Sequence, residues 1–108
     1  MKTLQNVTKD FFESILDVIA KNSSKSYGLI ILKDMKKNFI KEFPVLKFIE
    51  LDGPLKIDAN IKSADVDEIS MLFNKIIDTV GPDMLKIFIK EEMDPTNIKY
   101  LSNIGVKF

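Results

Sequence analysis

Four lysines share one face of a predicted helix and are the clearest candidates for contact with a charged partner. Lys33, Lys36, Lys37 and Lys41 recur at spacings of three and four residues, which places them on one side of a helix. Ammonium groups in this arrangement attract the phosphates of nucleic acids or anionic headgroups. The same pattern is typical of the wet side of any amphipathic helix. We treat these lysines as candidate contacts for an anionic partner.

The charge of the chain is divided along its length. Residues 1–47 contain nine lysines and five acidic residues, a net charge of +4, whereas residues 48–108 contain seven lysines and eleven acidic residues, a net charge of −4. This polarity favours docking of one half on the other, or head-to-tail association of two copies, as much as nucleic-acid binding. Because the whole chain is neutral and has no arginine to read bases, it matches a DNA reader poorly.

The residue types that are missing exclude several chemistries. The chain has no cysteine and no histidine, so thiol nucleophiles, thiolate metal sites and the usual general base near neutral pH are all ruled out. Its four glycines are scattered, so no glycine-rich loop can hold a phosphate, and no nucleophile motif is present. We therefore predict a protein that is not an enzyme and that holds no metal or cofactor.

Two further groups of residues are candidates for sites. Asp65, Asp67 and Glu68 could bind a hard cation, but they lack the ligand order of a calcium loop, and we expect them to cap a helix. The chain is also rich in phenylalanine, and some of its aromatic residues fall outside the main apolar stripes. We predict that these form an exposed apolar patch for a partner: Phe48, Tyr100 and Phe108.

The elements that position these residues belong to one predicted domain, residues 1–108, of the α+β class. It is predominantly α-helical, with about five helices and one β-hairpin. Residues 1–43 are expected to form a helical pair, residues 45–61 the β-hairpin and residues 65–105 a helical segment. Apolar stripes at helical spacing support this division, the clearest being Val66, Ile69, Phe73, Ile76 and Val80.

The predicted strands are Val45 to Leu51 and Leu55 to Ile61. They flank Asp52-Gly53, a strong hairpin signal, although Pro54 lacks the N–H that would close a tight turn. Two other segments allow both readings, because they alternate like strands inside helical patterns: Tyr27 to Leu32 and Leu85 to Ile89. We favour helix for both, and strand stays the alternative.

An internal match suggests a duplicated helical hairpin. Residues 12–19 align with residues 73–80, with Phe, Ile, an aliphatic residue, Asp and another aliphatic residue at the same spacing, and a second apolar segment follows each. With the helix beyond Gly81, this pattern resembles small helical output and regulatory domains of archaeal signalling proteins over residues 63–93. The resemblance implies a protein-binding regulatory module without catalytic residues.

The sequence predicts a non-catalytic protein-interaction or regulatory module that self-associates as a homodimer. One alternative is a nucleic-acid-binding regulator that uses the lysine face, and another is a helical domain that binds a small molecule. The longest apolar run is Leu29 to Leu32, so no membrane partner is expected. No signal peptide is recognisable either, and we expect a cytoplasmic protein.

Overall fold

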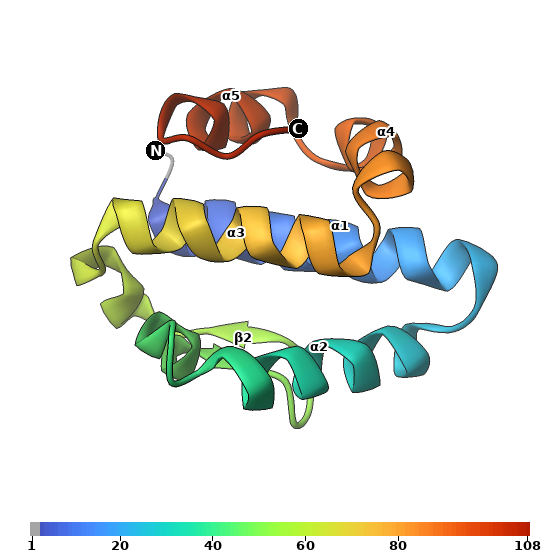
Figure 1. Cartoon of the computed structure of the whole chain (residues 1–108), viewed down its shortest axis with the longest axis horizontal. Helices are drawn as coiled ribbons and strands as arrows, with labels where there is room; N and C mark the ends of the chain where they lie inside the picture. Colours follow the sequence, from blue (N-terminus) through green and yellow to red (C-terminus); the bar gives the residue numbers. More distant parts are fainter. Residues whose placement is uncertain (1–2) are drawn as a thin grey trace.

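The helices are arranged in three layers (Figure 1). The computed structural model describes residues 3–108. Helices α1 and α3 form the middle layer, α2 and the β-hairpin lie on one side of it, and α4 and α5 lie on the other. The five α-helices are α1 (Leu4–Asn22), α2 (Lys25–Phe39), α3 (Val66–Val80), α4 (Pro82–Glu92) and α5 (Pro95–Asn103). The predicted α-rich class with five helices and one hairpin is confirmed.

The helix boundaries follow from side chains that the sequence supplies. The Ser24 hydroxyl accepts a hydrogen bond from the Tyr27 N–H, and the Asp65 carboxylate accepts one from the Asp67 N–H. These bonds satisfy donors that a helix start leaves free. Tyr27 to Leu32 and Leu85 to Ile89 are both helical, which confirms the favoured reading. No helix within residues 3–108 is long and apolar enough to cross a membrane.

The β-hairpin is present, but its strands are much shorter than predicted. Strand β1 (Ile49–Glu50) pairs antiparallel with β2 (Lys56–Ile57). Most of the other residues predicted as strand lie in two 3₁₀ helices, η1 (Pro44–Phe48) and η2 (Ala59–Ser63).

A sequence feature explains the missing strand residues in η1. Val45 and Leu46 are consecutive and both are buried, whereas successive side chains of a strand point to opposite faces. A helical turn places both on the core. At η2 the Asp58 carboxylate accepts a hydrogen bond from the Asn60 N–H and turns the chain away from the extended conformation.

Three phenylalanines join α1 to α3 at the centre of the core. The rings of Phe11 and Phe73 are stacked, with centroids 4.0 Å apart and an interplanar angle of 2°. Phe12 meets the Phe73 ring edge-on at 5.9 Å. All three side chains are buried, and each aromatic pair adds about 0.5–1.5 kcal/mol beyond the burial of area.

The C-terminal segment is held on the middle layer by long-range hydrogen bonds. Asp10 in α1 accepts from the Asp94 N–H at 3.1 Å and from Asn97 Nδ2 at 2.6 Å. Asn74 in α3 donates a hydrogen bond to the Gly105 carbonyl at 3.0 Å, and its side-chain oxygen accepts one from the Lys107 N–H. The tail therefore docks, and Val106 is buried.

Candidate functional site

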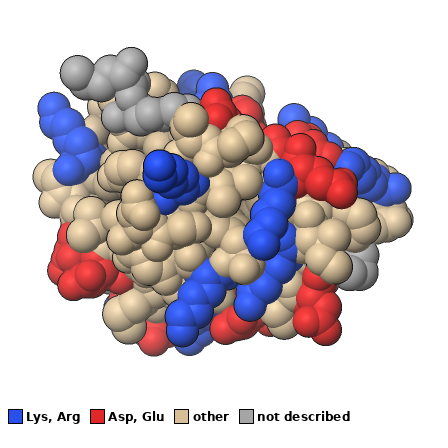
Figure 2. Space-filling view, turned by 90° about the horizontal axis from the view of Figure 1, so that it is seen from above, with Lys and Arg blue, Asp and Glu red and all other residues tan. Residues whose placement is uncertain are grey.

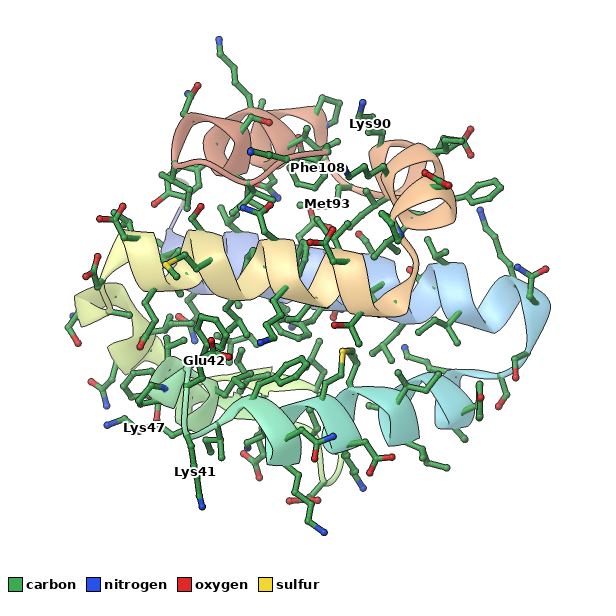
Figure 3. The ribbon with its side chains drawn as sticks, viewed as in Figure 1. Lys41, Glu42, Lys47, Lys90, Met93 and Phe108 are labelled. Atoms are coloured by element: carbon green, nitrogen blue, oxygen red, sulfur yellow. The ribbon has the colours of Figure 1, made fainter. Side chains whose placement is uncertain are left out.

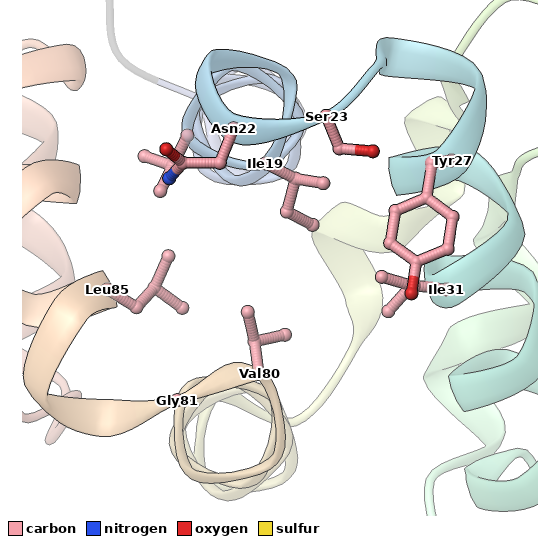
Figure 4. A pocket seen from close by; sticks show the side chains of 9 residues that line it. Ile19, Asn22, Ser23, Tyr27, Ile31, Val80, Gly81 and Leu85 are labelled. Atoms are coloured by element: carbon pink, nitrogen blue, oxygen red, sulfur yellow. The ribbon is translucent and has the colours of Figure 1, made fainter.

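An apolar cleft opens where the turns of the two helical hairpins meet (Figure 4). Its volume is about 310 Å³, at the lower end of the range of small-ligand sites. Its walls come from the end of α1, the beginning of α2, the end of α3 and the beginning of α4. The lining residues are Val18, Ile19, Asn22, Ser23, Tyr27, Ile31, Val80, Gly81 and Leu85. None of these side chains is charged at neutral pH.

The cleft exists because α2 and α4 both pack on α1 and diverge from each other. Gly28 allows α2 to approach closely, since a Cβ at this position would lie 3.0 Å from Leu16 Cδ2. Gly81 has a φ of 138°, a backbone region that favours glycine, and it directs α4 away from α3 toward α1. Ile19 and Val80 point into the space between the two helices (Figure 4).

The rim of the cleft offers hydrogen-bonding groups without charge. Asn22, Ser23 and Tyr27 are exposed there, and Tyr27 keeps 51% of its surface accessible. Ile30, three residues further along α2, is 57% exposed, and this spacing places it on the same side of the helix. The apolar surface therefore continues from the cleft onto the outside of α2.

The four predicted lysines do share a face of α2 and its extension, but two of them are engaged within the chain. Lys36 Nζ donates to the Ile49 carbonyl at 2.7 Å, and Lys33 Nζ lies 3.6 Å from an Asp52 carboxylate oxygen. These contacts hold the hairpin against α2 around a hollow of about 250 Å³. Lys37 and Lys41 are exposed, and Lys41 extends away from the body of the molecule (Figure 3). Contact with an anionic partner stays a prediction.

The structure does not bring the three predicted patch residues together. Phe48, Tyr100 and Phe108 are each half-buried and packed against the core. Phe48 ends η1 on one side of the middle layer, whereas Tyr100 in α5 and Phe108 in the docked tail lie on the other side (Figure 3). Among the side chains that the structure describes, the most exposed large apolar ones are Tyr27, Ile30, Val66, Met71 and Ile87. The exposure of Ile30 and Ile87 could be predicted from the sequence, because both fall on the lysine-bearing side of their helices.

Outside the lysine face, one lysine links two helices, and on one face of the molecule charges of both signs are mixed. Lys75 lies 2.8 Å from Glu42 and 4.9 Å above the Phe39 ring, which ties α3 to α2. Across the face that contains α4 and α5, lysines and acidic residues are interspersed (Figure 2). Within residues 3–108 no cluster of acidic side chains is arranged to hold a metal ion.

Comparisons with protein-family models, with curated proteins and with solved structures give no match to this chain. The resemblance of residues 63–93 to helical domains of archaeal signalling proteins therefore stays a prediction. Three of the residues that carry it, Phe73, Ile76 and Ile77, are buried in the core, so the pattern describes packing.

Proposed function

We propose that this protein is a non-catalytic, cytoplasmic interaction module that receives an apolar side chain of a protein partner in the cleft. The observation that carries the proposal is an uncharged apolar hollow of about 310 Å³ that is continuous with the exposed side chains of Tyr27 and Ile30. Anchor side chains that fill such pockets supply much of the binding energy of protein interfaces. A regulatory role follows if occupancy of the cleft depends on the state of the partner.

The chemistry of the lining favours binding over catalysis. Its polar side chains are one amide, one aliphatic hydroxyl and one phenol, from Asn22, Ser23 and Tyr27. General acid–base catalysis most often uses a histidine, a carboxylate or a lysine, and the cleft lining contains none of these residue types. Groups of this kind instead orient a bound molecule by neutral hydrogen bonds while the apolar walls provide the affinity.

The proposal can be tested before a partner is known, by using isolated side chains as probes. N-acetyl-leucinamide, N-acetyl-phenylalaninamide and N-acetyl-lysinamide differ only in the side chain that they offer. In amide and methyl NMR titrations, the two apolar probes should shift the signals of Ile19, Ile31, Val80 and Leu85 saturably. Dissociation constants on the order of 1 mM are expected for ligands of this size, and the lysine probe should not bind there.

A matched pair of variants locates the binding. Val80→Glu places a carboxylate at the mouth of the cleft and should abolish the shifts, whereas Met71→Glu makes the same change at a 61% exposed position of the same helix and should leave them unchanged. Tyr27→Ala alters only an exposed rim residue and should weaken binding several-fold in a folded protein. Equal binding by the wild type, Val80→Glu and Tyr27→Ala would contradict the proposal.

The homodimer predicted from the sequence is one arrangement in which the cleft is filled by a second copy. Light scattering over a concentration series measures the solution mass directly. A dimer that Val80→Glu dissociates and Met71→Glu leaves intact would identify the second copy as the occupant. A mass that stays at that of one chain of 12.3 kDa would leave a foreign protein as the partner.

A further inference from the structure

We propose that the partner is an acidic amphipathic helix that lies along the outer face of α2 and inserts one apolar side chain into the cleft. This inference rests on the proposed function and adds the chemistry of the partner to it. Two features of α2 carry it: an exposed apolar stretch that begins at the cleft, and a basic stretch that continues it.

The two stretches lie on one line along the helix. Tyr27 and Ile30 are exposed near the beginning of α2, and Lys37 is exposed near its end. Lys37 follows Ile30 by seven residues, which is close to two full turns, so both point outward on the same line. Leu32 and Met35 occupy the opposite, buried side. A partner that begins at the cleft and follows α2 therefore meets apolar side chains first, then the single exposed carboxylate of Asp34, and then Lys37 and Lys41.

The charge of this face selects an acidic partner. Residues 25–41 contain five lysines and one acidic residue, a net charge of +4. Lys36 is bonded to the hairpin and Lys33 lies beside Asp52, whereas Lys37 and Lys41 are exposed. Carboxylates opposite these ammonium groups would accelerate association and select against basic partners, and the effect should weaken as salt is added.

The spacing fixes the pattern that the partner must present. Tyr27 and Lys37 are ten residues apart, about 15 Å along the axis of a helix. A partner helix of about 14 residues spans this distance, with an apolar anchor at one end and carboxylates about ten residues further along. Such helix-in-groove recognition uses anchors at spacings of three, four and seven residues. A phosphate backbone would match the lysines but offers nothing to Ile30.

The test uses two synthetic helical peptides of about 14 residues with the same leucine stripe. In one peptide the polar positions are glutamate, and in the other they are lysine. By fluorescence anisotropy at low salt, the acidic peptide should bind at least tenfold more tightly than the basic one. Physiological salt should weaken its binding several-fold through screening.

Two double variants with the same change in net charge locate the contact. Lys37→Glu with Lys41→Glu should reduce binding of the acidic peptide at least tenfold, whereas Lys99→Glu with Lys107→Glu, exposed positions in and after α5, should not. Equal binding of both peptides, or equal loss in both variants, would overturn the inference. A single-stranded oligonucleotide that binds more tightly through Lys37 and Lys41 would overturn it in favour of nucleic acid.

The amide probes separate failure of this inference from failure of the proposed function. If the apolar amides occupy the cleft and the acidic peptide does not bind, the cleft remains an interaction site and the acidic helix is wrong. If neither the amides nor the peptide binds at the cleft, both proposals fail together.

Discussion

The two helical hairpins begin with the same apolar spacing but send their second helices in different directions. In the first hairpin, α2 follows a polar link at Ser23 and Ser24 and returns antiparallel along α1 (Figure 1). In the second, Gly81 alone separates α3 from α4, and α4 leaves α3 to pack chiefly on α1. The link between the helices, more than their apolar pattern, decides where the second helix packs.

This difference creates the candidate site. Here α2 and α4 approach α1 from different sides, and Ile19 and Val80 are left half-buried between them. Further along the middle layer, α5 and the tail cover the core through hydrogen bonds with Asp10 and Asn74.

The largest effect is expected where the two hairpins share a core. Phe73→Ala removes a buried ring that contacts both Phe11 and Phe12 and should lower the free energy of unfolding by about 3–5 kcal/mol. Phe88→Ala, at a half-buried position of α4, should cost only about 1 kcal/mol. Urea denaturation measures both values. Equal losses would mean that the Phe88 ring contributes as much to the core as the Phe73 ring does.

The close return of α2 can be broken at Gly28. Gly28→Leu places a side chain against Leu16, where even a Cβ lies at 3.0 Å, and should destabilise the protein by about 1–3 kcal/mol through overpacking. Gly53→Ala is the control, because no atom lies within 4 Å of a Cβ there, and it should change stability by less than about 0.5 kcal/mol. If Gly28→Leu is as harmless as the control, α2 does not depend on close approach.

The departure of α4 can be broken at Gly81. Gly81→Ala meets no steric contact but must adopt a φ of 138°, which costs of order 1–3 kcal/mol for a residue with a side chain. The chain can relieve this strain only by moving α4, so the NMR signals of Leu85 and Val80 should shift with the loss of stability. A loss of stability without shifts of these NMR signals would show that the conformation of Gly81 does not determine the position of α4.

The smallest effect concerns the ion pair that ties α4 to α1. Lys21 in α1 contacts Glu92 in α4, and that hydrogen bond, together with the attraction of Glu92, Glu91 and Asp17, raises the pKa of Lys21 against the effect of desolvation. A pKa raised by folding stabilises the protein fully below the unfolded value. This contribution disappears as the pH rises through the folded value.

Lys21→Gln removes the pair and provides the test. The variant should show a small deficit in Tm at neutral pH that persists up to about pH 10, near the ordinary lysine pKa, and then vanishes at higher pH. Thermal scans of both proteins at several alkaline pH values measure this. Lys21 Nζ also lies 6.0 Å from the centre of the Phe88 ring. A deficit in Tm that stays constant above about pH 11 would mean that Lys21 stabilises the protein by packing on this ring and not by its charge.

The helices were readable from the sequence because local signals agree. Apolar stripes, the polar break at residues 22–24, the caps Asp65 and Asp94, and the break at Gly81-Pro82 all indicate where helices begin or end. The alternation at residues 55–61 predicts a longer strand than the structure forms, because alternation indicates two faces but not a pairing partner. A strand needs a partner strand of equal length to pair with. Val45 and Leu46 cannot supply it, because both are buried in a 3₁₀ helix.

The site was not readable from the sequence, because it depends on how distant helices pack. Ile19, Ile31 and Val80 carry the same apolar signal as core residues, and only the divergence of α2 from α4 leaves them half-buried. The lysine face was readable as a grouping, but the bond from Lys36 to Ile49 depends on where the hairpin folds. The burial of single aromatic residues was also not readable. An aromatic residue outside the main apolar stripes can still pack on the core, as do Phe48, Tyr100 and Phe108.

The central claim is that the cleft receives an apolar side chain, and the most direct test is to locate a bound one. Intermolecular NOEs between N-acetyl-leucinamide and the methyl groups of this protein report contacts within about 5 Å, the scale of side-chain packing distances. We expect NOEs to Ile19, Ile31 and Val80 that disappear in Val80→Glu. NOEs only to exposed methyl groups elsewhere, such as those of Met71 and Ile87, would contradict it.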